Sequence, residues 1–172
     1  MAPGGNDMPQ KIIGIFGSGK ATEDEAEYDL ALSVGRLAAE KGFIVLTGGL
    51  GGVMTAASRG AKAAGGLTVG ILPGHRGTSP PNAFVDIAIF TGMGEARNVI
   101  NVKSCNAAIA IGGEYGTLSE IALALKGGCP IILLNSWTLS PFGGLKRPGW
   151  QVADSAEGAV ALAVAAAGQI KG

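Results

Sequence analysis

The chain has few residues of the kinds that bind metals or form covalent cross-links. Its 172 residues include two cysteines and one histidine. Cys105 and Cys129 are far apart in the sequence, and a site built from them and His75 would be short of ligands. We therefore expect no metal coordinated by the protein, and we interpret both cysteines as small buried residues in a reducing compartment.

Net charge and long apolar runs are missing as well. Basic and acidic residues number 13 each, so the formal net charge is zero, whereas duplex nucleic acid calls for a strongly basic face. The polar start MAPGGNDMPQ has no apolar core of a secretory signal. The run AVALAVAAA is too short to span a bilayer. We expect a cytoplasmic protein whose partners include neither nucleic acid nor membranes.

Apolar residues and glycine are abundant instead. Hydrophobic residues make up 47% of the chain, and 30 residues are glycine, against an average usage of roughly 7%. The glycines cluster at the joints between apolar segments, where tight turns are needed. The length fits one domain, so we predict a single nucleotide- or cofactor-binding domain over residues 1–172, with residues 1–10 as a flexible N-terminus.

Apolar runs alternate with helical patterns along the chain. The predicted strands are residues 11–17, 43–49, 67–74, 84–92, 106–111, 130–135 and 150–154. The predicted helices are residues 22–42, 51–66, 94–105, 116–128 and 155–169. The strands are continuously apolar, which is typical of a parallel sheet covered on both faces. We predict an α/β fold: a single three-layer Rossmann-like domain with a mostly parallel sheet of about six or seven strands.

Ligands of such sheets bind beyond the carboxyl ends of the strands, where this chain has three glycine-rich turns. The first, GIFGSGKA, nearly matches a Walker A loop, but Ala21 occupies the position that requires Ser or Thr. Its segment Gly17–Gly19 either offers N–H groups to an anion or a ribose or is a plain turn. The second, TGGLGGVM, lacks the dinucleotide-binding fingerprint, yet its glycines permit a ligand to approach the backbone.

The third turn is IGGEYGTLSE, Ile111–Glu120. Its three glycines surround Glu114 and Tyr115, and they predict a backbone nest for a phosphate, with the Thr117 hydroxyl as a further contact. Thr117 and Glu120 also match a capping box, as Thr22 and Glu25 do, so helix capping is the alternative interpretation of Glu120. Arg97, in GEARN, is either an exposed arginine or a bidentate anion clamp at the same edge of the sheet.

These three motifs occur in an order that resembles the LONELY GUY superfamily, whose members are often labelled lysine decarboxylase-like. The resemblance extends from about Ile12 to Asn135, with Ile111 in place of the proline of P-G-G-x-G-T-x-x-E. It implies N-glycosidic cleavage of nucleoside 5′-monophosphates rather than lysine decarboxylation. Arg97 and Glu120 would be the catalytic pair, and the phosphate would rest on the third turn.

A second branch of this superfamily contains molybdenum cofactor carrier proteins, which bind the phosphate-bearing pterin without turning it over. The segments GSGKA, GAKAAGGLTVGILPG and EIALALK resemble that branch more closely. Our leading prediction is a carrier-like protein that binds the molybdenum cofactor or a nucleotide. The alternatives are a phosphoribohydrolase and a non-catalytic nucleotide sensor. Since relatives assemble through helices, we expect a homodimer or homotetramer.

The residues predicted to bind the cofactor come from the three turns and from Arg97. They are Gly17, Ser18, Gly19, Gly48, Gly49, Gly51, Gly52, Arg97, Gly112, Gly113, Glu114, Tyr115, Gly116, Thr117 and Glu120.

Overall fold

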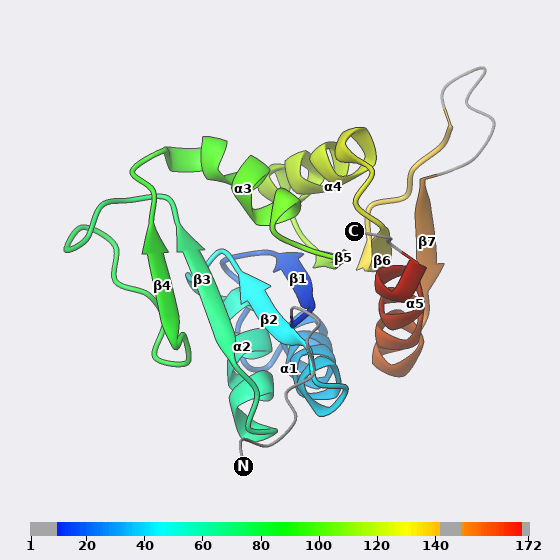
Figure 1. Cartoon of the computed structure of the whole chain (residues 1–172), viewed down its shortest axis with the longest axis horizontal. Coiled ribbons are helices and arrows are strands. Elements are labelled where there is room, and N and C mark those ends of the chain that lie inside the picture. Colours follow the sequence, from blue (N-terminus) through cyan, green and yellow to red (C-terminus); the bar gives the residue numbers. More distant parts are fainter. Residues whose placement is uncertain (1–9, 142–148, 170–172) are drawn as a thin grey trace, which may run out of the picture.

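The computed structural model describes residues 10–141 and 149–169, and these form an α/β domain (Figure 1). The strands are β1 (Ile12–Gly17), β2 (Ile44–Thr47), β3 (Thr68–Leu72), β4 (Ile87–Phe90), β5 (Ala107–Gly112), β6 (Ile131–Ser136) and β7 (Trp150–Ala153). The helices are α1 (Ala26–Glu40), α2 (Val53–Ala63), the 3₁₀ turn η1 (Gly94–Arg97), α3 (Asn98–Lys103), α4 (Tyr115–Gly127) and α5 (Ala156–Gln169).

All strand pairs are parallel, and the sheet of 7 strands has the order β4-β3-β2-β1-β5-β6-β7. The predicted α/β class and Rossmann-like architecture are confirmed. Residues 1–9, on which most of the prediction of a flexible N-terminus falls, lie outside the described residues. The prediction that residues 1–172 form a single domain stays a prediction.

Two apolar cores form, one on each face of the sheet. Helices α1, α2 and α5 cover one face, with buried contacts from Ile13, Ile15 and Val45, and α3 and α4 cover the other (Figure 1). The apolar strands predicted that helices cover both faces of the whole sheet. The edge strand β4 is an exception, because its Ile87 and Ile89 side chains are 46% and 44% exposed. The reason is that α4 packs over the central strands, while the link from β3 to β4 contains no helix in the described structure.

The strand order places a topological switch point between β1 and β5. From β1 the chain winds outward to β2, β3 and β4, and it then returns to pair β5 with the other side of β1. In such a sheet the loops that follow the two strands turn to opposite faces, which opens a crevice between them. The first and third glycine-rich turns follow β1 and β5, so the fold brings them together at that crevice.

Helices α1 and α2 pack with their backbones in close approach. A Cβ at Gly35 would collide with the carbonyl oxygen of Ala57, and a Cβ at Gly60 would collide with that of Leu32. The two glycines therefore allow α1 and α2 to lie this close together on the sheet. The turns after β1 and β2 lead into these two helices.

We predict that Gly35→Ala or Gly60→Ala lowers the free energy of unfolding by about 1–3 kcal/mol, because the added methyl group overpacks the contact. The measurement is urea denaturation followed by circular dichroism. The control is Gly168→Ala in α5, where a Cβ meets no atom within 4 Å and alanine should be neutral or slightly stabilising. Equal stability of Gly35→Ala and Gly168→Ala would contradict the close packing.

Candidate functional site

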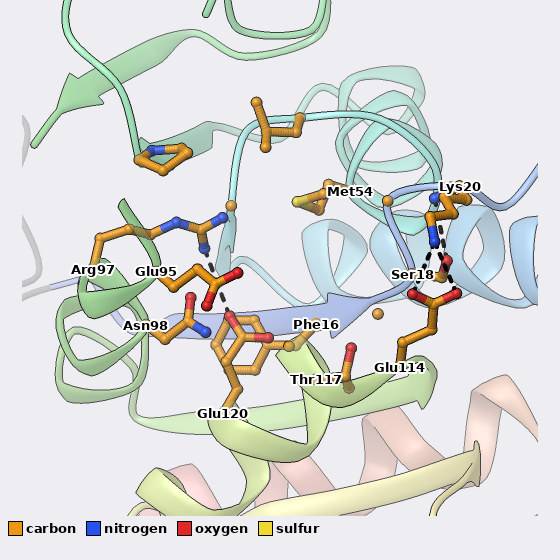
Figure 2. Close-up of a pocket in the computed structure, with 16 residues that line it drawn as sticks. Phe16, Ser18, Lys20, Met54, Glu95, Arg97, Asn98, Glu114, Thr117 and Glu120 are labelled. Atoms are coloured by element: carbon orange, nitrogen blue, oxygen red, sulfur yellow. Dashed lines mark hydrogen bonds and ion pairs between the residues drawn. The ribbon is translucent and has the colours of Figure 1, made fainter. Parts of the chain in front are cut away.

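A cavity of about 370 Å³ opens at the carboxyl edge of the sheet, at the switch point between β1 and β5 (Figure 2). Its walls come from the turns after β1 and β2, from the end of β3, from η1 and α3, and from the first turns of α4. The lining residues are Phe16, Gly17, Ser18, Gly19, Lys20, Gly48, Leu50, Met54, Pro73, Glu95, Arg97, Asn98, Glu114, Gly116, Thr117 and Glu120.

Arg97 and Glu120 lie together in the wall of this cavity (Figure 2). Arg97 is 8% exposed and Glu120 is 6% exposed, so the interpretation of Arg97 as an exposed arginine is wrong. Arg97 Nη1 lies 3.6 Å from Glu120 Oε1, and the same carboxylate oxygen accepts a hydrogen bond of 2.9 Å from Asn101 Nδ2. Helix α3 thus supplies a neutral donor and η1 a cation to one carboxylate of α4.

Glu120 is not a capping residue. Helix α4 begins at Tyr115, with Glu114 at the N-cap position, so Thr117 already lies inside the first turn. Glu120 falls one turn further on, and its carboxylate binds Asn101 of α3 instead of a backbone N–H. The capping interpretation of Glu120 is therefore wrong, because the helix starts earlier than the Thr-x-x-Glu pattern indicates.

The pattern at Thr22 also differs from the prediction. The Glu25 carboxylate accepts a hydrogen bond of 2.7 Å from the Thr22 N–H, which is half of a capping box. However, α1 begins only at Ala26, and no side chain caps its N-terminus. The interaction therefore closes the turn that precedes the helix.

The N-terminus of α4 has backbone N–H groups to offer. No side-chain cap bonds to it, and among the described turns and caps the first of its N–H groups with a backbone acceptor is that of Leu118, which donates to Glu114. The first N–H groups of a helix have no partner within the helix, and the helix dipole makes this end attractive to anions. Gly116 and Thr117 line the cavity at this end.

Thr117 depends on Gly113 for its position. Gly113 has a φ of +94°, and a Cβ there would collide with the Thr117 side chain. Thr117 is 3% exposed, and its hydroxyl makes no hydrogen bond within residues 10–141 and 149–169. Gly113 therefore shapes the turn for Thr117 without lining the cavity itself.

Burial controls the electrostatics of the Arg97–Glu120 pair. It raises the pKa of Glu120 to about 7, although the hydrogen bond from Asn101 and the charge of Arg97 favour the ionised form. It also lowers the pKa of Arg97, against the charges of Glu120 and Glu95. Arg97 Nε is buried with no hydrogen-bond partner in the described part of the chain. The guanidinium is therefore incompletely satisfied by the protein, and a ligand in the cavity could accept hydrogen bonds from it.

Part of the predicted site lies away from the cavity. The structure brings together nine of the predicted residues as lining: Gly17, Ser18, Gly19, Gly48, Arg97, Glu114, Gly116, Thr117 and Glu120. The predicted residues that do not line it are Gly49, Gly51, Gly52, Gly112, Gly113 and Tyr115. Tyr115 is 82% exposed, with its ring centroid 6.1 Å from that of Trp137.

The second glycine-rich turn supports the first one. The Gly49 N–H donates to the Thr47 hydroxyl at 3.1 Å, and the Val53 N–H donates to the Ser18 carbonyl at 2.9 Å. A Cβ at Gly52 would collide with that same carbonyl. The Gly49 N–H is thus engaged within its own turn, and the Val53 N–H at the start of α2 holds the turn after β1. At Gly48, a Cβ would lie 2.7 Å from both terminal nitrogens of Arg97, so glycine leaves room for the guanidinium.

Several lining residues were missed at the level of sequence. They are Phe16, Lys20, Leu50, Met54, Pro73, Glu95 and Asn98. The apolar ones carry no signal, because Phe16 and Met54 look like core residues of a strand and a helix. Lys20, Glu95 and Asn98 stand within three residues of predicted positions, and that proximity was the available clue.

The described ranges contain no cluster of histidine, cysteine or carboxylate side chains that could hold a metal ion. None of the described helices has the length and apolarity needed to span a bilayer.

We predict that Glu120 titrates with an apparent pKa of about 7. The folded state favours the protonated carboxyl of Glu120. The contribution of this carboxyl to the free energy of unfolding is therefore complete below pH 4.5, the ordinary pKa of a glutamate, and is lost as the pH rises through about 7. Wild type should therefore lose up to about 3 kcal/mol of stability relative to Glu120→Gln over this range. The measurements are carboxyl ¹³C NMR and urea denaturation at several pH values. A Glu120 pKa below 5, with a constant stability difference, would contradict this.

Comparison with known proteins matches these features to a family. The model of the SLOG cluster4 family matches residues 10–161. An uncharacterized protein of Archaeoglobus fulgidus is 54% identical over 116 residues, which are 67% of this chain and 74% of that protein.

Two solved structures are similar over nearly the full chain. The molybdenum cofactor binding protein of Rippkaea orientalis is 44% identical, with a TM-score of 0.82 over 92% of this chain and 98% of that one. The Moco carrier protein of Chlamydomonas reinhardtii is 40% identical, with a TM-score of 0.81 over 94% and 99% of the two chains. The predicted resemblance to the carrier branch of the superfamily is confirmed. On the extent of the family match, the chain belongs to the SLOG cluster4 family.

Proposed function

We propose that this protein binds the molybdenum cofactor as a carrier-like protein, with the phosphate of the cofactor at the N-terminus of α4. One observation carries the proposal: the cavity combines an uncapped helix N-terminus with a buried guanidinium that lacks a full set of partners. Both features favour an oxyanion. The similarity to two molybdenum cofactor proteins supports the choice of ligand.

The rest of the cavity fits a flat, polar-edged ring system. Phe16, Leu50, Met54 and Pro73 give it an apolar wall, against which a pterin would stack. Carboxylate and amide groups also line it, and they would accept hydrogen bonds from the N–H groups of a pterin. Its volume of about 370 Å³ lies within the usual range for small-molecule sites.

A second candidate function is hydrolysis of nucleoside 5′-monophosphates, and the Arg97–Glu120 pair is the observation that favours it. With a pKa of about 7, Glu120 is partly ionised at neutral pH. A carboxylate beside a ribosyl centre would stabilise an oxocarbenium-like transition state or orient the attacking water, while Arg97 would orient the substrate. A non-catalytic nucleotide sensor, the third candidate, would use the same cavity without turnover. Lysine decarboxylation is not among these proposals.

We predict that the protein retains the molybdenum cofactor through ultrafiltration and releases no adenine from AMP. The first measurement is fluorescence of the oxidised pterin in the retained fraction, and the second is chromatography of the reaction with AMP. Release of adenine that disappears in Glu120→Gln would favour the phosphoribohydrolase. Loss of the pterin to the filtrate would contradict the carrier proposal.

Thr117→Val supplies the site-specific arm of this experiment. Removal of a hydroxyl that bonds to a charged phosphate costs about 1.5–3 kcal/mol, or roughly tenfold to a hundredfold in affinity. The matched control is Thr138→Val, since Thr138 is exposed and lies outside the cavity. Equal retention of the cofactor by both variants would place the phosphate elsewhere.

We also propose that the protein forms a homodimer or homotetramer in the cytoplasm, without nucleic acid or membrane partners. Exposed apolar side chains support self-association: Ile87 and Ile89 on β4, with Met93 and Val99 near them in the chain. We predict a mass of two or four chains by analytical ultracentrifugation, and a shift toward the monomer in Ile89→Lys. The control is Val152→Lys on β7, which is 70% exposed. A monomeric wild type would contradict the proposal.

A further inference from the structure

An ion pair spans the switch point at the rim of the cavity. Lys20 Nζ donates to both carboxylate oxygens of Glu114, at 3.1 and 3.0 Å (Figure 2). Lys20 comes from the turn after β1, and Glu114 is the N-cap residue of α4 after β5. The pair therefore joins the two turns that the sheet topology brings side by side.

The pair lines two cavities. Both residues contact the cavity of Arg97 and Glu120, and both contact a neighbouring cavity of about 430 Å³. The second cavity has an acidic wall that includes Glu25 and Glu27. An anion at the N-terminus of α4 would thus be attracted by Lys20 and repelled by the carboxylates of Glu25 and Glu27 in the second cavity.

Glu114 has the position of a capping residue, but its side chain does not cap. In the described structure its carboxylate accepts no hydrogen bond from the N–H groups of the first turn of α4. The carboxylate faces the ammonium group of Lys20 instead, and the first N–H groups of the helix stay open. The N-terminus of α4 and Lys20 both favour an anion. Glu114 is the anionic partner of Lys20 but not of the helix N-terminus.

The ion pair is easily exchanged. The Lys20 and Glu114 side chains are 79% and 64% exposed, and ion pairs between exposed side chains contribute little to stability. A phosphate group carries more charge than one carboxylate and can also bond to the helix N-terminus and to Thr117. It would therefore compete well for Lys20.

We propose that Lys20 is a phosphate-binding residue and that Glu114 holds it when no ligand is present, so that the ligand exchanges with Glu114 on binding. This inference rests on the proposed phosphate site at α4. It adds a threshold for binding, because the displacement of Glu114 costs every anion the same free energy. A small anion gains only the phosphate contacts, whereas a ligand with a ring also gains the apolar wall of the cavity.

The test is a double-mutant cycle with AMP and with inorganic phosphate as probes, measured by calorimetry at low salt. Lys20→Met should weaken AMP binding about tenfold, since a charge-assisted hydrogen bond is lost. Glu114→Gln should tighten the binding of both probes by a similar, several-fold factor, because the cost of displacing Glu114 is common to both. In the Lys20→Met background, Glu114→Gln should have a clearly smaller effect, because the lysine is no longer there to be released.

The matched control is the ion pair of Arg59 and Glu23, which is 2.9 Å long, exposed, and outside the cavity. Arg59→Met and Glu23→Gln should leave both affinities unchanged. Unchanged AMP binding in Lys20→Met, together with a loss in Thr117→Val, would overturn the role of Lys20 and leave the phosphate site standing. Absence of binding of AMP and of the molybdenum cofactor, in wild type and in Glu114→Gln, would overturn both.

Discussion

The burial of Arg97 and Glu120 beneath one cavity is the constraint on which the site depends. A guanidinium and a carboxylate removed from water need partners, and here the protein supplies only part of them: one hydrogen bond from Asn101 and an ion contact of 3.6 Å. Burial accordingly raises the pKa of Glu120 and lowers that of Arg97. Arg97, whose buried Nε has no hydrogen-bond partner among the described residues, borders the same space as the N-terminus of α4. A ligand with a phosphate and a polar ring would complete both.

The three glycine-rich turns have different tasks around that cavity. The turn after β5 leads into α4, and Gly113 makes room in it for Thr117. After β2, the Gly49 N–H bonds to Thr47 within its own turn, and the Val53 N–H supports the turn after β1 through the Ser18 carbonyl. The turn after β1 brings Lys20 to the rim, opposite Glu114. Glycine thus permits close packing of the backbone in the turn after β2, and it makes room for Thr117 in the turn after β5.

The fold was predictable from the sequence because the strands are continuous apolar runs separated by helical patterns, and each pattern reports directly on local structure. The edge strand β4 was less predictable, since exposure of Ile87 and Ile89 depends on which strands the helices cover. In the site, the motifs led to Arg97, Thr117 and Glu120. They did not reveal that Glu114 rather than Thr117 is the N-cap residue of α4, and so the role of Glu120 was open.

Other parts of the site could not be predicted from local pattern. Whether the Val53 N–H of the second turn is free depends on the Ser18 carbonyl, which is distant in sequence. The partnership of Lys20 and Glu114 spans 94 positions and exists only because β5 returns to the side of β1. Apolar wall residues such as Phe16 resemble core residues until the cavity is seen.

The most direct measurement of the central claim is a ¹H–¹⁵N NMR titration of the protein with the molybdenum cofactor, with AMP as a second ligand. Binding of the phosphate at the N-terminus of α4 predicts the largest amide shifts at Gly116 and Thr117, with a smaller response at Val53, whose N–H already donates to Ser18. Shifts concentrated at Val53 and Met54, with Gly116 and Thr117 unmoved, would contradict the claim.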